Sequence, residues 1–364
     1  MEKIVFAGSF DPLTNGHLWV IEEGLQIANK VAVFVAENSS KKTMFTAKER
    51  AQMIEESCKA KGFKDRVEVM IIRNEYVAKK AIQIGATHLI RGIRSAIDFD
   101  YEGLIQKTNV DVLGGAKTVF VMPPRDLESV SSSFVKSLIG PVGWHWHVKQ
   151  FLPSPVYKKL LEDFVSKTAK IFINRENPED FLKIVFENYS NGDRYYHNLD
   201  HIVHCLQEML WLNSNSSENI DYEQLCVAIL AHDVIYGAKQ EKSDEVLSAE
   251  LLLEKLGSGF RHAYNLVLAT QHFKDKKEFS IEEKIMRSLD LTILGQDIKL
   301  YKKYSQSVRK EYSFVSDEDY KNGRIKVLER FLAKDVIFEA NIFAHYENQA
   351  RLNIKKELTK LTNS

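Results

Sequence analysis

Short runs of apolar residues alternate with amphipathic stretches through the first half of the chain. The apolar runs are rich in β-branched side chains and read IVFAG (4–8), VAVFVA (31–36), VEVMII (67–72), THLIRG (87–92) and TVFVMP (118–123). The stretches between them, such as residues 47–62, repeat apolar positions at the spacing of a helix. Buried strands separated by amphipathic helices are typical of a doubly wound α/β fold, so we expect a parallel sheet of five strands.

The pattern changes after about residue 165, where the strand-like runs stop. From Pro178 onward nearly every stretch has the apolar spacing of a helix, most clearly at 199–212, 222–236, 242–257 and 319–334. A segment punctuated by prolines, 153–170, lies between the halves and predicts a helix that leaves the first domain. We therefore expect two domains, an α/β domain over residues 1–160 and an all-α domain over residues 165–364.

Composition and charge exclude several classes of protein. The 50 basic and 50 acidic residues balance, which argues against a nucleic-acid partner bound through a basic surface. The 3 cysteines lie far apart without a CxxC pair, so we expect neither a disulfide framework nor a structural zinc site. No apolar run approaches the ~20 residues of a membrane span, and none has the length of a signal peptide. These features predict a cytoplasmic protein without a membrane partner.

Candidate chemistry in the first half follows the strand-like runs. The stretches GSFDPLTNGH (8–17), RGIR (91–94) and PPRDLESVSSS (123–133) each come directly after such a run. Because ligands bind at the carboxyl ends of parallel strands, we expect the three stretches to converge. They supply a histidine at a helix start, two arginines and a serine cluster, while Lys41 and Lys42 lie in a polar loop after the second run.

These groups are cations and hydrogen-bond donors, which suit phosphoryl or nucleotidyl transfer. Each alone has a structural alternative: the histidine as a helix cap, the arginines as surface ion pairs, and the serines as a loop or cap. Their shared position after strands favours one site.

Four stretches of the first half resemble the phosphopantetheine adenylyltransferase family of the nucleotidyltransferase superfamily. They are GSFDPLTNGH (8–17), RGIRSAIDFDYE (91–102), ESVSSSFVKSL (128–138) and FLPSPV (151–156). The resemblance runs from Met1 to about Leu160 and implies a Rossmann-like nucleotidyltransferase fold. It further implies adenylyl transfer from ATP, with Mg²⁺, to 4′-phosphopantetheine, giving dephospho-coenzyme A and pyrophosphate in coenzyme A biosynthesis. The family is commonly hexameric, so the resemblance also implies a homo-oligomer.

The resemblance assigns roles residue by residue. The catalytic residues would be His17, Lys41 and Arg91, with His17 stabilising the five-coordinate α-phosphate of ATP. The acceptor would be bound by Ser9, Lys41, Val77 and Arg91. ATP would be bound by Ser9, Phe10, His17, Gly92, Ile93, Arg94, Glu102, Ser129, Val130, Ser131, Ser132 and Ser133.

Two features depart from the family pattern. Lys107 stands where many members have a histidine, and the segment 140–150 is longer and more aromatic than usual. Both features concern acceptor contacts and subunit packing. A different acceptor, such as a pyridine mononucleotide or a cytidylyl-transfer substrate, is the alternative, although RGIRSAIDFDYE and SSSFVKS fit the phosphopantetheine enzymes better.

The helical half carries metal-ligating residue types in three stretches, RYYHNLDHIVHC (194–205), LAHDVIYG (230–237) and RSLDLTILG (287–295). His197, His201 and His204 have the spacing of one helix face, and the pair His232-Asp233 lies in an apolar run that we expect to be helical. A buried charge is costly unless it is paired or bound to metal. Nitrogen and oxygen ligands suit Mg, Mn, Fe, Co, Ni or Zn alike, and a buried hydrogen-bonded His–Asp pair is the alternative.

The second half resembles the HD superfamily of metal-dependent phosphohydrolases over about residues 172–360. The superfamily pattern H…HD…D implies the metal ligands His201, His232, Asp233 and Asp290. His197 and His272 would support the ligands or touch the substrate. The implied reaction is hydrolysis of a phosphate ester or nucleotide, with the metal and the substrate left open. A metal-stabilised nucleotide sensor or assembly module without turnover is the alternative.

Overall fold

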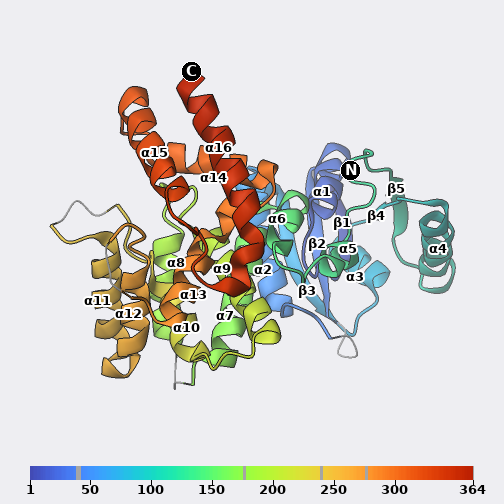
Figure 1. Cartoon of the computed structure of the whole chain (residues 1–364). Helices are drawn as coiled ribbons and strands as arrows, with labels where there is room; N and C mark the ends of the chain where they lie inside the picture. The colour runs from blue at the N-terminus through green and yellow to red at the C-terminus, as the bar shows by residue number, and fades with distance from the viewer. Residues whose placement is uncertain (38–41, 175–177, 238–240, 275–277, 364) are drawn as a thin grey trace. The chain divides into compact units, whose positions relative to one another are not determined.

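The computed structural model describes residues 1–37, 42–174, 178–237, 241–274 and 278–363. The chain divides into two compact units, Met1–Leu160 (unit 1) and Leu161–Ser364 (unit 2). Figure 1 shows the strands gathered in the first part of the chain and helices in the rest. Each unit is described by itself.

Unit 1 contains a single parallel sheet among its described residues. Its strands are β1 (Lys3–Gly8), β2 (Lys30–Glu37), β3 (Val67–Arg73), β4 (His88–Gly92) and β5 (Lys117–Val121). They lie in the order β3-β2-β1-β4-β5, and every pairing is parallel (Figure 1). The five-stranded parallel sheet predicted from the apolar runs is therefore confirmed.

Helices cover both faces of this sheet. The longer ones are α1 (Asn15–Ile27), α2 (Ala47–Ala60), α3 (Val77–Gln83) and α4 (Ala96–Lys107), followed by the short α5 (Ser132–Ser137) and α6 (Trp144–Val148). Helix α1 lies against the face that bears Ile4 and Val31, where a Cβ added to Gly24 would come within 2.9 Å of Val31 Cγ2. Helix α3 packs Ala78 and Ala81 into the core on the other face. The sheet is thus doubly wound, as expected from the alternation of elements.

Unit 2 is helical throughout its described part. Its elements are α8 (Glu179–Tyr189), α9 (Leu199–Asn215), α10 (Tyr222–Ala231), α11 (Asp244–Leu256), α12 (Arg261–Ala269), α13 (Ile281–Leu291), α14 (Ile298–Glu311), α15 (Asp317–Leu332) and α16 (Glu347–Asn363). Helix α7 (Ser154–Phe172) contains the boundary between the units. Helix α10 is buried from Gln224 to Ala231 and packs against α9, α12 and α13, which makes it the central helix of this unit.

Two helix ends differ from the prediction. Helix α10 ends at Ala231, before His232 and Asp233, whereas the apolar run predicted a helix to residue 236. Two side-chain contacts account for this end: the N–H of Asp233 donates to the Tyr189 hydroxyl, 3.1 Å away, and His232 Nδ1 lies 2.8 Å from the carbonyl of Ile229. Side chains thereby replace the next backbone bond of the helix.

The other difference concerns the start of α9. Asn198 is the N-cap of this helix, and its side chain accepts the N–H of Asp200 at 2.9 Å. His197 therefore precedes the helix and does not share a helical turn with His201. None of the described helices is long and apolar enough to cross a membrane.

A buried arginine on α2 joins the ends of two strands to the following loop. Arg50 is 1% exposed and its guanidinium donates to the carbonyls of Ala36 (3.2 Å), Phe45 (3.1 Å) and Ser9. Ser9 follows β1 and Ala36 lies near the end of β2, so a single side chain fixes the chain at the carboxyl edge of the sheet.

We predict that Arg50→Met destabilises unit 1. The substitution leaves three carbonyl groups without their donor, which should cost about 3 kcal/mol. Arg73→Met is the matched control, because the Arg73 side chain is 69% exposed and pairs only with Glu37 among the described residues. Differential scanning fluorimetry should show a clear fall in melting temperature for Arg50→Met and little change for Arg73→Met. Equal melting temperatures would contradict the role of Arg50.

Candidate active sites

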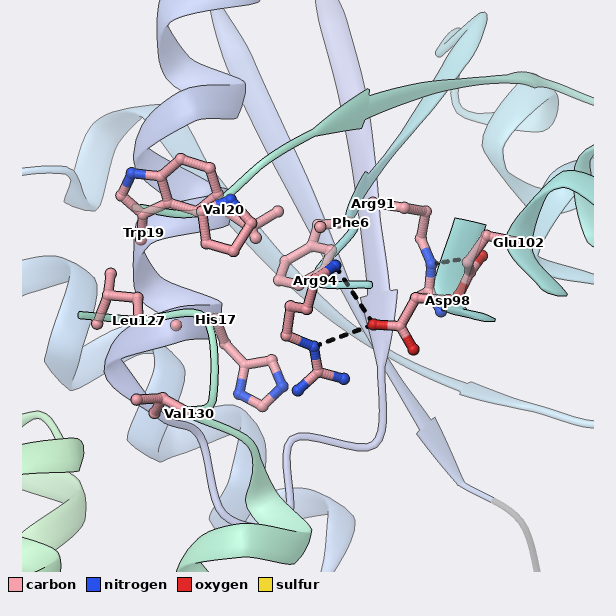
Figure 2. A pocket seen from close by; sticks show the side chains of 13 residues that line it. Phe6, His17, Trp19, Val20, Arg91, Arg94, Asp98, Glu102, Leu127 and Val130 are labelled. Carbon is pink, nitrogen blue, oxygen red and sulfur yellow. Dashed lines mark hydrogen bonds and ion pairs between the residues drawn. The ribbon is translucent and has the colours of Figure 1, made fainter. Parts of the chain in front are cut away.

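The candidate site of unit 1 lies at the carboxyl ends of β1 and β4, which are neighbours in the sheet. A pocket of about 140 Å³ opens there, and Figure 2 shows the side chains around it. Its lining includes Gly16, His17, Arg91, Gly92, Arg94 and Val130. The three stretches expected to converge do meet, since each contributes to this lining.

His17 is held at the first turn of α1 by Thr14, the N-cap residue. The backbone N–H of Thr14 donates to Nδ1 of His17 at 3.0 Å, and the Thr14 hydroxyl lies 2.9 Å from the same nitrogen. Because a backbone N–H can only donate, Nδ1 is the unprotonated nitrogen of the ring. The proton of the neutral imidazole is therefore on Nε2, away from the helix cap.

The surroundings of His17 keep its ring neutral. Burial, together with the positive charges of Arg94 and Arg91, lowers the pKa of His17 from 6.5 to about 4. The ring of Phe10 packs edge-on against the imidazole, with 5.2 Å between ring centroids. His17 is thus a fixed hydrogen-bond donor without a charge at neutral pH.

The two arginines of the pocket differ in how many donors they have left. Arg91 forms a two-pronged ion pair with Glu102 and donates to the carbonyl of Ala7 at 2.6 Å, so all three of its nitrogens are engaged. Arg94 has a weaker pairing, 3.3 Å from Asp98, and its side chain is 40% exposed. Arg94 is therefore the arginine more readily available to an anion.

The serine cluster has a partly structural role. Ser131 caps α5 by accepting the N–H of Phe134 at 3.1 Å, and Ser132 donates to the carbonyl of Pro12 at 2.8 Å. Ser129 and Ser133 are exposed. The cluster therefore combines an anchored helix start with exposed hydroxyls, and its contact with phosphate stays a prediction.

The remaining predicted residues of unit 1 are spread around the pocket. Ser9 is exposed, Ile93 is buried, and Phe10 reaches His17 without being part of the pocket wall. Val77 is the first residue of α3 and packs at the edge of the core. Lys41 lies outside the described residues. The assigned roles of all these residues stay predictions.

Sequence reasoning missed Asp11 and Trp19. The buried carboxylate of Asp11 accepts the N–H groups of Met44 and Phe45, each at 3.0 Å, and lies 3.1 Å from Lys136 Nζ. It thereby joins the loop before α2 to α5. Trp19 lines the pocket two residues after His17. Asp11 stands inside the quoted stretch GSFDP, but its partners are far away in sequence and could not be read from it.

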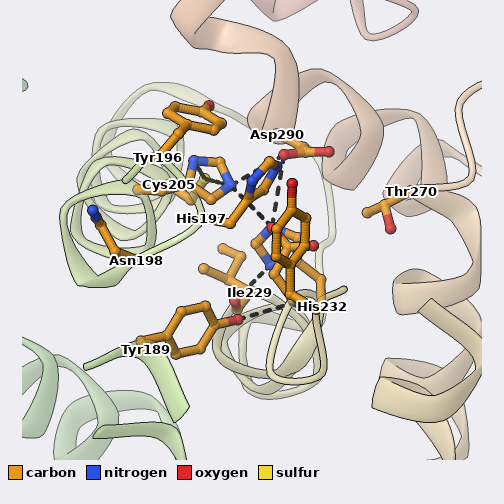
Figure 3. Close-up of polar contacts among 12 residues, drawn as sticks. Tyr189, Tyr196, His197, Asn198, Cys205, Ile229, His232, Thr270 and Asp290 are labelled. Atoms are coloured by element: carbon orange, nitrogen blue, oxygen red, sulfur yellow. Dashed lines mark hydrogen bonds and ion pairs between the residues drawn. The ribbon is translucent and has the colours of Figure 1, made fainter. Parts of the chain in front are cut away.

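The candidate site of unit 2 is a compact cluster of four side chains. His201 comes from α9, His232 and Asp233 follow α10, and Asp290 comes from α13. Figure 3 shows His232 and Asp290 of this cluster. One ligand atom from each of His201, His232 and Asp290 lies within 4.8 Å of the others. The Asp233 carboxylate is 3.2 Å from His232 Nε2 and 3.7 Å from His201 Nε2.

The spacing of these atoms suits donors around one cation. The two Nε2 atoms of His201 and His232 are 3.0 Å apart, and Asp290 Oδ1 lies 3.2 and 3.6 Å from them. Donors that are each about 2.1 Å from a central ion lie about 3.0–3.4 Å from one another. His232 Nδ1 faces the carbonyl of Ile229 and so carries a proton, which makes Nε2 the nitrogen for a metal. Burial alone would lower the pKa of His232, but Asp233 and Asp290 raise it, so a metal would displace the Nε2 proton when it binds. The residues therefore fit a divalent metal.

Hydrogen bonds with three histidines stabilise the ionised carboxylate of Asp290. Burial alone would raise the pKa of Asp290, but hydrogen bonds with His201, His232 and His272 keep it well below its usual range. His272 Nε2 lies 2.7 Å from Asp290 Oδ2, whereas His201 and His232 lie near the other oxygen of this carboxylate, Oδ1. The buried Tyr196 hydroxyl has no hydrogen-bond partner among the described residues, which is consistent with a site that binds a further group.

His197 lies beside the cluster in a separate network. Its Nδ1 is 2.7 Å from Glu311 Oε2, and its ring stacks on Tyr236 with 4.1 Å between centroids. Glu311 also accepts the backbone N–H groups of Tyr196 and His197 at 2.7 and 2.9 Å. His204 takes no part in the cluster, since its Nε2 faces the hydroxyl of Thr292 at 2.9 Å.

Arg194 was not predicted and fixes the turn that follows α10. Its guanidinium donates to the carbonyls of Asp233 (2.6 Å) and Val234 (2.9 Å) and lies over the rings of Tyr189 and Tyr236. The same guanidinium contacts the carbonyl of His197 at 3.3 Å. One side chain therefore ties together the two segments that carry His197 and Asp233.

Comparisons of sequence point to known proteins for unit 1. A family described as cytidylyltransferase-like matches residues 5–138. A phosphopantetheine adenylyltransferase from Chromobacterium violaceum is 40% identical over 161 residues, which are 44% of this chain and 96% of the relative. The enzyme of the same name from Dictyoglomus thermophilum is 37% identical over 169 residues, 45% of this chain and 96% of its own. A solved nicotinic acid mononucleotide adenylyltransferase from Plasmodium falciparum covers 44% of this chain and 96% of its own at 15% identity and a TM-score of 0.35, too weak a likeness to carry an argument.

The match with the relatives from Chromobacterium and Dictyoglomus spans nearly their whole length. The match with the cytidylyltransferase-like family, residues 5–138, falls on the part of the chain that carries the five-stranded sheet and the pocket around His17. Through its first unit, this chain belongs to the phosphopantetheine adenylyltransferase family.

Proposed function

We propose that unit 1 transfers the adenylyl group of ATP to 4′-phosphopantetheine, giving dephospho-coenzyme A and pyrophosphate. The observation that carries this proposal is a neutral His17 whose Nε2 proton is available to a ligand. His17 lines a pocket with Arg94 at the carboxyl ends of β1 and β4. Such a pocket suits a phosphate that gains negative charge during the reaction. The family of unit 1 supports the choice of ATP and of the acceptor.

The reaction needs no covalent intermediate on the protein. An oxygen of the acceptor phosphate attacks the α-phosphorus of ATP, the bond from that phosphorus to the bridging oxygen breaks, and pyrophosphate leaves. The attacking oxygen is already ionised, so no base has to remove a proton. His17 Nε2–H would donate to an oxygen of the α-phosphate as charge develops there, and Arg94 would offset that charge. ATP would enter as its magnesium complex.

We predict that His17→Ala abolishes most of the adenylyl transfer while leaving the fold intact. Loss of one preorganised donor to a transition-state oxygen typically lowers kcat by about 10²- to 10³-fold. Pyrophosphate release in the presence of ATP and 4′-phosphopantetheine measures this effect, and circular dichroism checks the fold. His147→Ala is the control, because His147 is exposed and lies outside the pocket. A His17→Ala variant with near-native turnover would exclude the proposed role.

The lowered pKa of His17 gives a second prediction. A histidine with an ordinary pKa of 6.5 gains its proton as the pH falls through neutrality, whereas His17, with a pKa of about 4, should stay neutral. In NMR spectra of ¹⁵N-histidine-labelled protein, the His17 ring should keep the neutral Nε2–H form between about pH 8 and 5.5. The His17→Ala spectrum identifies the signals. A titration midpoint near the ordinary value would contradict the buried, cation-flanked position of the ring.

We further propose that unit 2 binds a divalent metal through His201, His232, Asp233 and Asp290 and hydrolyses a phosphate ester or nucleotide. The favouring observation is the convergence of two imidazole nitrogens and two carboxylates at donor spacing in a buried site. A bound divalent cation would lower the pKa of a water ligand and offset the charge of a phosphate.

The chain's own residues would orient these ligands. His272 holds one oxygen of Asp290, so the other oxygen is directed at the two histidines. Arg194 fixes the turn that carries Asp233. A metal-stabilised nucleotide sensor or assembly module remains the alternative, since it would use the same ligands without turnover.

We predict that Asp233→Ala loses the metal of unit 2. Removal of one of the four donors should weaken metal binding at least about tenfold, because the three that remain include one carboxylate and no longer offset the two positive charges of the metal. Inductively coupled plasma mass spectrometry of the purified chain measures the metal content, and Asp335→Ala, which changes an exposed carboxylate outside the cluster, is the control. Equal metal content in the two variants would refute the ligand assignment. Metal-dependent phosphate release by the native chain, lost in Asp233→Ala, would favour the hydrolase over the sensor.

A further inference from the structure

Three cations of unit 2 share one carboxylate. Arg287 comes from α13, Arg330 from the last turn of α15, and Lys334 follows α15. The carboxylate of Glu339 forms a two-pronged ion pair with Arg287 at 2.9 and 3.1 Å and lies 3.3 Å from Lys334 Nζ. Arg330 has no carboxylate partner within the described parts of the chain, where its guanidinium donates to the carbonyl of Phe273 at 3.3 Å. The three cations therefore form a basic cluster with an excess of positive charge.

Two phenyl rings gather the cations of this basic cluster in one place. The guanidinium of Arg330 lies over the ring of Phe273, with 4.1 Å from Cζ to the ring centroid, and Lys334 Nζ lies 6.0 Å from the same centroid. Lys334 Nζ is also 5.9 Å from the ring of Phe331, which packs against Phe273 with 4.8 Å between centroids. A cation is attracted to the face of an aromatic ring, so the rings hold two positive charges close together without neutralising them.

Repulsion inside the basic cluster acts on Lys334. Burial and the charges of Arg287 and Arg330 lower the pKa of Lys334, although Glu339 opposes them. Glu339 cannot offset more of the charge, because Arg287 already occupies both of its carboxylate oxygens. An anion placed between Arg330 and Lys334 would remove this repulsion, so the arrangement of the cations is more favourable with an anion bound than without one.

We propose that Arg330 and Lys334 form a binding site for a phosphate group above the ring of Phe273. A guanidinium presents paired N–H donors and an ammonium presents a compact positive charge, and both suit the oxygens of a phosphate. Arg287 would not touch the ligand, since it is 3% exposed and all three of its nitrogens already have acceptors. It would instead hold Glu339, the acidic neighbour, in its own ion pair.

The proposed phosphate site is separate from the metal cluster of unit 2. His272 and Phe331 connect the two: His272 Nε2 faces Asp290 at 2.7 Å, and the rings of His272 and Phe331 are 6.2 Å apart between centroids. Phe331 is in turn the ring beside Lys334. A phosphate held by Arg330 and Lys334 is therefore not one that contacts the metal ligands, and the site rests on neither of the functions proposed above.

Reductive methylation of the full chain, followed by peptide mass spectrometry, measures the occupancy of this site at Lys334. Formaldehyde condenses with the free amine and a hydride donor reduces the imine, so the rate follows the unprotonated fraction of each lysine. Inorganic phosphate bound beside Lys334 should raise the pKa of its amine by about one unit and slow its methylation about tenfold, compared with chloride at equal ionic strength. Lys302, which is exposed on α14 and lies outside the basic cluster, is the control within the same chain and should keep its rate.

Arg330→Gln separates a phosphate site from a general effect of salt. Arg330 is exposed, so the substitution should leave the fold intact while the protection of Lys334 by inorganic phosphate is lost. Asp233→Ala, which removes a proposed metal ligand, should keep that protection. Unchanged methylation of Lys334 with inorganic phosphate in the folded native chain, or equal protection in Arg330→Gln, would overturn the phosphate site and leave both proposed functions standing.

The same assay identifies the source of the phosphate group, with adenosine 3′,5′-bisphosphate as a probe that carries two separated phosphates. If the site takes the second phosphate of a ligand held at the metal cluster, the bisphosphate with Mn²⁺ should protect Lys334 at a concentration about tenfold lower than inorganic phosphate. Asp233→Ala should abolish that gain. If the site takes a separate phosphate ligand, the bisphosphate and inorganic phosphate should protect Lys334 at similar concentrations in both proteins.

Discussion

The adjacency of β1 and β4 in the sheet is the constraint on which the site of unit 1 depends. These strands are 80 or more residues apart in the chain, yet Ile4 lies opposite His88 and Val5 opposite Leu89 in a parallel ladder. Their carboxyl ends consequently open at one edge, where the helix that follows β1 starts beside the arginines that follow β4. Arg91 reinforces the adjacency, because it donates from the end of β4 to the carbonyl of Ala7 on β1. The position of His17 follows from this arrangement.

The buried polar groups of the two units favour ligands of opposite charge. In unit 1 the cap residue Thr14 fixes the proton on one ring nitrogen, and nearby arginines keep His17 neutral. In unit 2 two carboxylates and two imidazoles share a buried space, and the surplus of lone pairs suits a cation. The first arrangement donates to a negative ligand, while the second gathers donors for a positive one. These complementary electrostatics favour two separate chemistries in one chain.

Much of the fold and part of each site could be predicted from the sequence. The strands have β-branched apolar runs, and the stretches after them carry the pocket, so periodicity and strand ends sufficed for His17, Arg94 and the stretch 123–133. The ends of helices were harder, because α10 stops where the Tyr189 hydroxyl takes the N–H of Asp233, a contact between residues far apart in the chain.

The same reason explains the residues that were missed. Arg50 looks like an ordinary helix arginine, and only the folded sheet shows that it is buried among three carbonyl groups. Trp19 reads as one apolar residue of an amphipathic helix, since the loop that faces it comes about a hundred residues later. Such roles depend on tertiary contacts, whereas local pattern reports only which face of an element is apolar. The roles implied for Lys41 and Val77, and a hexameric assembly, stay predictions from the family resemblance.

The acceptor of the adenylyl group tests the central claim most directly. The native chain would be incubated with ATP labelled at the α-phosphate and, in parallel, with 4′-phosphopantetheine, nicotinate mononucleotide and nicotinamide mononucleotide, and the labelled product would be separated by chromatography. The account predicts that the label appears in dephospho-coenzyme A with an equal amount of pyrophosphate, at a kcat/KM at least about 10³-fold above that for either pyridine mononucleotide. Label that passes preferentially to a pyridine mononucleotide, or to no acceptor at all, would contradict it.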